Sequence, residues 1–370
     1  MTDRTVTRSS VTRASVTARD VTARPLPRIL TVLLVLTLLA PLLAPVRGQA
    51  AAETLDLAMA MDRAVQASVE VRTARLDLDA ARREAARVQA DPTSLRVPTL
   101  NARHDVEAAR DALRNAEASA RDAAADAFEA ALEAQDSVAI AEAAMRIARV
   151  EARAAAIRLE AGAATESDVA RAEDVVRSAE RDLRDARQAQ ELARDRLAVR
   201  LGEAGDLLAL DGSVPEPVVP SLDEATSRLD ENASLRSARR AVVVAEAQLE
   251  AVDVAFTVAR ADVEAARDRL DSAELRADDL RSSLTLAVRQ AHNAVLAAEG
   301  RLASAREQVA TAEEDVRVAN VRFEAGSIAE VALERARLDL LRRNAEARSA
   351  RHGLADALRS LEATILGAGS

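Results

Sequence analysis

The sequence contains no cysteine, tryptophan, tyrosine or lysine, and its aromatic residues are only Phe128, Phe256 and Phe323. The absence of cysteine excludes disulfides, thiolate metal sites and a lipid-bearing amino-terminal cysteine. So few aromatic rings argue against a compact core built on large side chains, so we expect small side chains to pack closely. Glycine and proline are also scarce, at 10 and 9 of 370 residues. The remaining Ala, Arg, Glu and Leu favour long helices and largely exclude an all-β or α/β enzyme.

The charge balance argues against a nucleic-acid partner. Acidic residues outnumber basic ones by 61 to 51, which gives a net charge of -10. No basic face interleaved with aromatic residues is present, although nucleic-acid binding needs one.

Residues that could carry catalysis or bind a metal are sparse. His104, His292 and His352 lie in helical stretches without His-x-x-x-His spacing, so we expect most of them to be exposed helix residues and no metal to bind. The sequence has no nucleophile elbow and no glycine-rich phosphate loop. It therefore predicts a protein that is not an enzyme and needs no cofactor.

The amino-terminal segment has the order of a secretory signal peptide. An apolar run from Ile29 to Leu43 follows several arginines, and small residues come after it up to Ala52. We predict export and cleavage near Ala50 to Ala52, with residues 1–52 as signal and low-complexity leader. The alternative is an uncleaved membrane anchor, which Pro41 and Pro45 oppose.

The rest of the chain divides into two similar halves. A Pro/Gly-rich linker at residues 203–220 separates a first repeat, 53–202, from a second, 221–370, and the halves match at an offset of 164 residues. The first heptad seam of each half is apolar throughout. Its positions are Ala120, Ala124, Ala127, Ala131, Ala134, Val138, Ala141, Met145, Ala148, Ala152, Ala155 and Leu159, and the same positions plus 164, from Leu284 to Phe323.

Each half is predicted to form a long antiparallel coiled-coil hairpin. Glu-Ala-Gly follows the seam in both copies and places Gly162 and Gly326 at a left-handed helix cap. A second seam returns from Val169 to Leu197 and from Leu333 to Leu361, broken only by Gln190 and Arg343. We expect the first arm to begin near Ala102, after a reversal loop at residues 91–101. Shorter helices precede the hairpins, with Thr54 and Ser221 as N-caps.

These features resemble the TolC-like outer-membrane efflux family. The resemblance is carried by the Leu-x-x-Ala openings at Leu55 and Leu222, the Glu-Ala-Gly tips, the alanine ten residues after each tip glycine, and the Leu-Gly endings. It covers the chain from about Thr54 to Gly367. It implies an all-α fold of two tandem hairpins that assemble into a homotrimeric helical barrel in the periplasm or outer membrane.

The resemblance also implies partners and site residues. Hairpin tips of the family meet a periplasmic adaptor that links the tunnel to an inner-membrane pump, which assigns adaptor contact to Leu159, Gly162, Phe323 and Gly326. The family narrows its tunnel with aspartates six and nine residues after the second tip glycine, where this chain has Ala332 and Arg335. An altered constriction would use Asp168, Glu330, Glu334 and Arg335; the alternative is that these are ordinary charges at helix starts.

One departure concerns the membrane strands. The family inserts a pair of strands between the short and long helices of each half, each about 9–11 residues long. This sequence has room only for the 91–101 loop and for residues 252–259, which are either a vestigial strand or, as we favour, a Val-rich helical stretch. We therefore expect little or no β-barrel, and insertion in the outer membrane stays open.

The leading functional hypothesis is passive export through a periplasmic helical tunnel. The alternative is an envelope scaffold or spacer that kept the hairpins but transports nothing. An adaptor protein fits less well, because adaptors carry β-rich domains beside a single hairpin.

Overall fold

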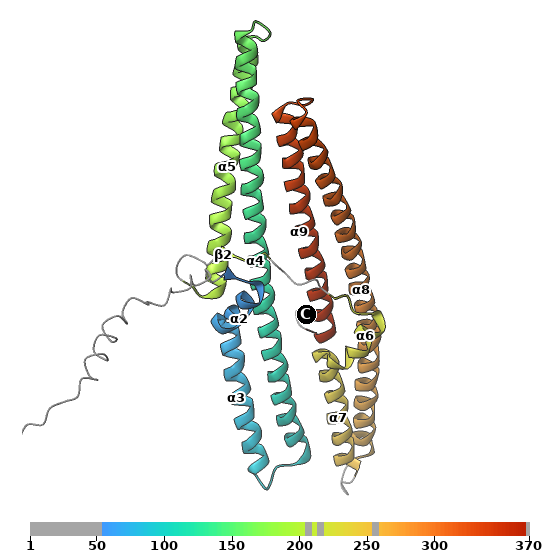
Figure 1. The fold of residues 1–370 in the computed structure, drawn as a ribbon. Coiled ribbons are helices and arrows are strands. Elements are labelled where there is room, and N and C mark those ends of the chain that lie inside the picture. The colour runs from blue at the N-terminus through green and yellow to red at the C-terminus, as the bar shows by residue number, and fades with distance from the viewer. Residues whose placement is uncertain (1–53, 204–208, 213–217, 254–258, 368–370) are drawn as a thin grey trace, which may run out of the picture. The chain divides into compact units, whose positions relative to one another are not determined.

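The computed structural model describes residues 54–203, 209–212, 218–253 and 259–367 (Figure 1). The signal-peptide prediction for residues 1–52 lies outside these ranges. Within them, the fold is all-α apart from one pair of two-residue strands. This confirms the predicted fold class. None of the described helices combines the length and the apolar character that crossing a membrane requires.

The first half contains four helices and one short strand. Strand β1 (Thr54–Leu55) precedes α2 (Leu57–Ala67), α3 (Val69–Ala90), α4 (Arg96–Glu160) and α5 (Glu166–Leu201). The long helix α4 lies beside α5 along its carboxyl-terminal part and beside α3 along its amino-terminal part (Figure 1). One continuous helix is therefore shared by two hairpins.

The second half follows the same order. After β2 (Ala209–Leu210) come α6 (Leu222–Ser227), the 3₁₀ turn η2 (Arg228–Glu231), α7 (Ala233–Asp253), α8 (Arg260–Glu324) and α9 (Glu330–Leu366). Helices α4 and α8 are both 65 residues long and begin 164 residues apart. Helix α8 lies beside α9 and α7 in the way that α4 lies beside α5 and α3.

The predicted seams form the helix contacts. In the long arms α4 and α8, every first-seam position is at least partly buried except Phe323, which lies at a tip. The return seams of α5 and α9, including the polar Gln190 and Arg343, are also at least partly buried. Alanine dominates these contacts, so the backbones can approach closely.

Two apolar clusters hold the bases of the hairpins. The first joins Leu55 of β1, α2, Phe128 of α4 and Leu197 of α5. The second joins Leu229 of η2, Val288 and Val295 of α8, and Leu361 of α9. The strand pair closes over the first cluster, since Leu55 pairs with Leu210 in parallel and is fully buried.

Some predicted helix boundaries were wrong. Thr54 lies in β1, and Asp56 caps α2 instead, because its carboxylate accepts a hydrogen bond of 2.7 Å from the Met59 amide. Ser221 is the cap of α6, as predicted. Helix α4 begins at Arg96, inside the predicted 91–101 loop, because proline is tolerated in a first helical turn and Pro98 lies there. In the 252–259 stretch, Val252 and Asp253 end α7, and residues 254–258 lie outside the described ranges.

Two left-handed glycines provide a matched test of packing. Gly162 and Gly202 have φ of 70° and 68°, but only Gly202 is enclosed: a Cβ there would lie 2.9 Å from Cβ of Ala67. Gly162→Ala should cost about 1–2 kcal/mol of stability from backbone strain alone. Gly202→Ala should cost more, because α5 must also move away from α2. Urea denaturation of the two variants would measure this; equal losses would contradict the packing argument.

Candidate functional sites at the hairpin tips and the α4–α9 junction

The two hairpin tips have the same backbone. At the first tip, the Gly162 amide donates to the Leu159 carbonyl and the Ala163 amide to the Arg158 carbonyl, at 2.9 and 2.7 Å. The second tip repeats this with Gly326 to Phe323 and Ser327 to Arg322, at 2.9 and 2.8 Å. This is the double hydrogen bond of a Schellman cap, which explains the glycine in each tip. Phe323 is 40% exposed, whereas Leu159 is partly buried.

The tips differ in how the returning helix begins. Helix α5 has a complete capping box, in which the Thr165 hydroxyl accepts from the Asp168 amide and the Asp168 carboxylate accepts from the Thr165 amide at 2.8 Å. Helix α9 begins at Glu330, and its N-cap residue Ala329 has no side chain that could cap the helix. Hydrogen bonds from Thr165, first of all from its amide, and the Arg171 guanidinium lower the pKa of Asp168 to about 2. The structure thus gives Asp168 a local role in starting α5.

The cap of α5 leads to a pH prediction. The folded-state pKa of Asp168 lies below its ordinary value, so the stabilisation is present above the ordinary carboxyl range and is lost as the pH falls toward 2. Asp168→Ala should abolish this loss and fray the first turn of α5 at neutral pH. Amide hydrogen exchange of residues 166–170 would measure the fraying. The double variant Ala329→Thr with Ala332→Asp should transplant the box and raise protection at the start of α9; unchanged protection there would contradict the capping argument.

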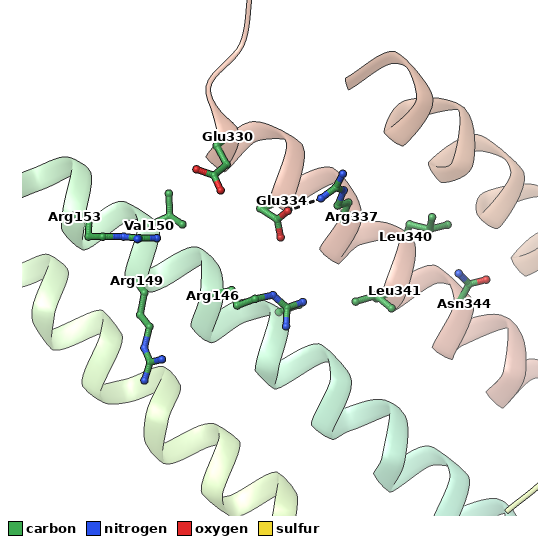
Figure 2. Close-up of a pocket in the computed structure, with 11 residues that line it drawn as sticks. Arg146, Arg149, Val150, Arg153, Glu330, Glu334, Arg337, Leu340, Leu341 and Asn344 are labelled. Carbon is green, nitrogen blue, oxygen red and sulfur yellow. Dashed lines mark hydrogen bonds and ion pairs between the residues drawn. The ribbon is translucent and has the colours of Figure 1, made fainter. Parts of the chain in front are cut away.

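The other predicted constriction residues lie near the second tip, facing α4. Glu330 and Glu334 of α9 line a cleft of about 620 Å³ whose opposite wall carries Arg146 and Arg153 of α4 (Figure 2). Glu334 accepts a hydrogen bond of 2.8 Å from Arg337 on its own helix. Arg335 points elsewhere and forms an ion pair of 2.5 Å with Glu151 of α4. Of the four residues predicted to form the constriction, Glu330, Glu334 and Arg335 thus lie in the first two turns of α9. Asp168 lies in α5 and belongs to the other hairpin.

A second cluster of charges joins α4 to α9 closer to the hairpin bases. The guanidinium of Arg359 on α9 lies 3.1 Å from Asp126, 3.3 Å from Glu129 and 3.8 Å from Asp122, all on α4. It also pairs with Asp356 on its own helix. Glu129 is only 5% exposed. Burial is the main cause that raises the pKa of both Glu129 and Asp122, against the attraction of Arg359.

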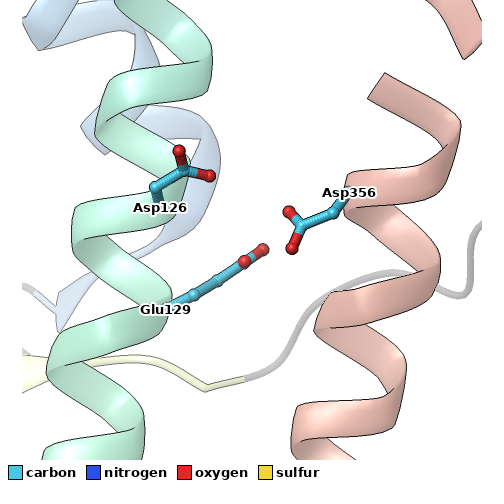
Figure 3. Close-up of side chains that lie close together, drawn as sticks. All are labelled: Asp126, Glu129 and Asp356. Atoms are coloured by element: carbon cyan, nitrogen blue, oxygen red, sulfur yellow. The ribbon is translucent and has the colours of Figure 1, made fainter. Parts of the chain in front are cut away.

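This cluster is the one group of potential metal ligands in the described part of the chain. Carboxylate oxygens of Asp126, Glu129 and Asp356 lie within 4.8 Å of one another (Figure 3). Arg359 already forms ion pairs with all three, so the positive charge there is supplied by the protein. The arrangement is an interhelical ionic lock of one arginine and four carboxylates.

Further ion pairs continue this junction toward both ends of α4. Toward the tip, Arg348 of α9 binds Asp136 in a bidentate pair, with one contact of 2.6 Å. In the other direction, the buried Asp111 accepts a hydrogen bond of 2.7 Å from Arg236 of α7, and Arg240 lies 3.7 Å away. The junction between the two halves therefore carries a series of ion pairs, and closer to the tips it also has a small apolar cluster in which Ala143 and Ile147 of α4 pack against Leu338 of α9.

The prediction that most of the histidines are exposed was wrong, because His104 is partly buried and His292 and His352 are buried. His352 is 4% exposed at the α4–α9 junction, where its Nδ1 lies 3.8 Å from a carboxylate oxygen of Glu133, and burial lowers its pKa. His292 is buried on α8, where its Nε2 contacts the Pro220 carbonyl at 3.0 Å. Heptad periodicity describes only the face of a helix toward its hairpin partner, so contacts on the other faces were missed.

Comparison with known proteins decides the fold. No family model matches the sequence, and no curated protein matches it. The structure is similar to that of CusC, whose crystal structures concern transmembrane channel formation, with a TM-score of 0.62 and 13% identity over 84% of this chain and 91% of that chain. The outer membrane protein VceC of Vibrio cholerae gives a TM-score of 0.59 and 14% identity over 84% and 96%.

The chain has a TolC-like fold. The CmeC outer membrane channel of Campylobacter jejuni agrees, with a TM-score of 0.58 and 11% identity over 84% of this chain and 86% of that chain. The TolC-like fold accounts for the two tandem hairpins. The ion pairs between α4 and α9 are observed in this chain itself and do not come from the comparison.

Proposed function

We propose that the chain is a subunit of a TolC-like efflux channel in the cell envelope and that it exports substrate passively, without covalent chemistry. The observation that carries the proposal is the fold, which agrees with outer-membrane channels over 84% of the chain. The long arms support it, since 65 residues of helix extend about 97 Å and suit the wall of a long tunnel.

The proposed organisation follows the sequence repeats. Residues 1–52 act as export signal and leader, 53–202 and 221–370 are two copies of one unit, and 203–220 connect them. Support comes from the 164-residue offset between α4 and α8 and between the tip glycines. Three copies of the chain then contribute six hairpins to one tunnel.

The proposed partners are a periplasmic adaptor at the hairpin tips and an inner-membrane pump that supplies the energy. Leu159, Gly162, Phe323 and Gly326 form the adaptor contact in this proposal. The exposed ring of Phe323 and the open space around both tip glycines support it, since a partner can approach the backbone there. Glu330 and Glu334, with Asp168 of the other hairpin, supply negative charge close to this end of the tunnel.

The test measures ion conductance of the purified full-length chain in planar bilayers. The measurement is repeated with bilayers to which outer-envelope membranes have been fused. Discrete, long-lived conductance steps are expected. Glu330→Gln with Glu334→Gln should lower the preference for cations, whereas Glu313→Gln, an exposed charge on α8, should not. A protein of correct fold that gives no conductance and no export would overturn the channel and favour the scaffold.

A further inference from the structure

The contact between α4 and α9 contains a concentration of buried polar atoms without a partner. Among the described residues, four buried side-chain atoms lack a hydrogen bond, and three of them belong to the neighbours Arg351 and His352 of α9. They are Nε of Arg351 and both ring nitrogens of His352. A buried polar atom that has lost its hydrogen bonds to water and gained none in return weakens the folded state. The junction is therefore less well stabilised at this level than at the ion pairs on either side of it.

The ring of His352 is directed toward α4. The residue is 4% exposed, and its Nδ1 lies 3.8 Å from a carboxylate oxygen of Glu133, which is beyond hydrogen-bond distance. The Glu133 side chain is half exposed, so water weakens its attraction for a charge on the ring. On the opposite side of α9, Leu354 packs into the apolar cluster with α8. The ring thus lies in the contact itself and has one carboxylate close to it.

The other carboxylates at this level are held by arginines. Asp136 of α4 is bound by Arg348 through two hydrogen bonds. Glu129 of α4 and Asp356 of α9 both pair with Arg359. These pairs lie on either side of the histidine and fix α4 against α9 in both directions along the helices.

The linker between the halves crosses next to the histidine. The Arg351 guanidinium donates a hydrogen bond of 3.0 Å to the Gly212 carbonyl. Asp211, the residue before Gly212, brings a carboxylate to this level, and its amide donates to the Leu55 carbonyl at 2.9 Å. The cation of Arg351 and the linker backbone thus lie beside His352 on the side that α4 leaves open.

Burial decides which form of the ring the closed contact favours. It lowers the pKa of His352 from the ordinary value of 6.5, and Arg351 acts in the same direction, whereas Glu133 and Asp136 oppose the shift. When the contact opens, the ring meets water and binds a proton more readily. The stability of the closed contact is therefore fully present above the ordinary value and declines as the pH falls below it.

We propose that His352 makes the contact of α4 with α9 sensitive to acid, so that a proton on its ring loosens the contact near Glu133. At neutral pH the ring is neutral and the contact is closed. In acid, the proton adds a buried charge that Glu133 offsets only in part, whereas an opened contact gives the charged ring water. The two halves of the chain are then held less firmly between the Arg348 and Arg359 ion pairs. The proposal concerns a single chain and does not rest on the proposed channel.

Thiol labelling measures the opening, because the chain has no cysteine of its own. Ala143→Cys places a thiol in the same contact, at a position that is 3% exposed and lies in the apolar cluster with Leu338 of α9. It is about 15 Å from Glu133 along α4, and a helix moves as a unit over such a length. Ser137→Cys is the exposed reference on the same helix. The ratio of the two labelling rates cancels the pH dependence of the thiolate itself.

The ratio of the Ala143→Cys rate to the Ser137→Cys rate should rise toward acid. If the open state alone binds the proton, the increase is up to about tenfold between about pH 7.5 and about pH 5.5. In a His352→Gln background, the side chain stays polar but no longer titrates, and the rise should disappear. His352→Leu should also remove it and lower the ratio at both pH values, because the unpartnered nitrogens are gone.

His104→Gln is the matched control. His104 is a partly buried histidine of α4 whose pKa is also lowered by burial, but it lies about 44 Å from Glu133 along the helix. This background should keep the full rise. A ratio that is independent of pH, or that falls toward acid because Glu133 captures the charged ring, overturns the proposal. An equal rise in the His352→Gln background overturns it as well, with far-UV circular dichroism showing that each variant is folded at both pH values.

Discussion

Replacing Arg359 with methionine is expected to lower the free energy of unfolding by about 3 kcal/mol. The substitution keeps much of the apolar stem but removes the cation that four carboxylates share. Loss of one partner from a buried ion pair costs about 3–5 kcal/mol, and the low end applies because Asp126 and Asp356 are exposed. Urea denaturation followed by far-UV circular dichroism measures the change. The matched control is Arg342→Met, an exposed arginine on the same helix, with a loss below about 0.5 kcal/mol.

The pH dependence of the Arg359→Met variant follows from the raised carboxyl pKa values. Glu129 and Asp122 titrate above their ordinary range in the folded chain, so protonation favours the folded state, and the gain appears as the pH falls through the raised pKa. The variant should therefore regain stability between neutral pH and the ordinary carboxyl range. Adding Glu129→Gln should restore part of the loss at neutral pH. A loss that is independent of pH and unaffected by Glu129→Gln would contradict the ionic lock.

The Phe128→Ala variant should lose about 3–5 kcal/mol of stability. Phe128 is fully buried in the cluster that joins β1, α2, α4 and α5, where most neighbours are alanine or leucine. Helices that are already in close contact through alanine cannot collapse further to fill the space of a phenyl ring. The loss should appear in a thermal or urea melt as a lower midpoint with helical content kept below the transition.

Phe323→Ala is the matched control for Phe128→Ala. Its ring is 40% exposed at the second hairpin tip, so truncation removes little buried area. Stability should change by less than about 1 kcal/mol. A large loss at Phe323, or a small one at Phe128, would contradict the assignment of the first to the surface and the second to the core.

The hairpins were predictable from sequence because their contacts are periodic and local. The seams ending at Leu159 and Phe323, and the left-handed Gly162 and Gly326, follow from spacing alone, and the structure contains each of them. The start of α4 was less predictable. Pro92 and Pro98 together suggested a single loop between two helices, although Pro98 fits the first turn of α4.

The junction between the halves could not be predicted from the heptad pattern. A heptad pattern specifies which face of a helix meets its hairpin partner, but it does not specify which other helix comes next or in what register. The lock around Arg359 joins residues about 230 positions apart, and it depends on the register of α4 against α9. The burial of His352 in the same junction was missed for the same reason.

Helix α4 passes without interruption from the hairpin with α3 to the hairpin with α5. A continuous hydrogen-bonded rod resists bending and twisting far more than two segments joined by a loop would. A displacement or rotation applied at the tip near Gly162 is thus transmitted with little loss to the loop before Arg96, about 97 Å away. Helices α4 and α8 are therefore expected to transmit motion along their whole length, from the hairpin tips to the ends that pack against α3 and α7.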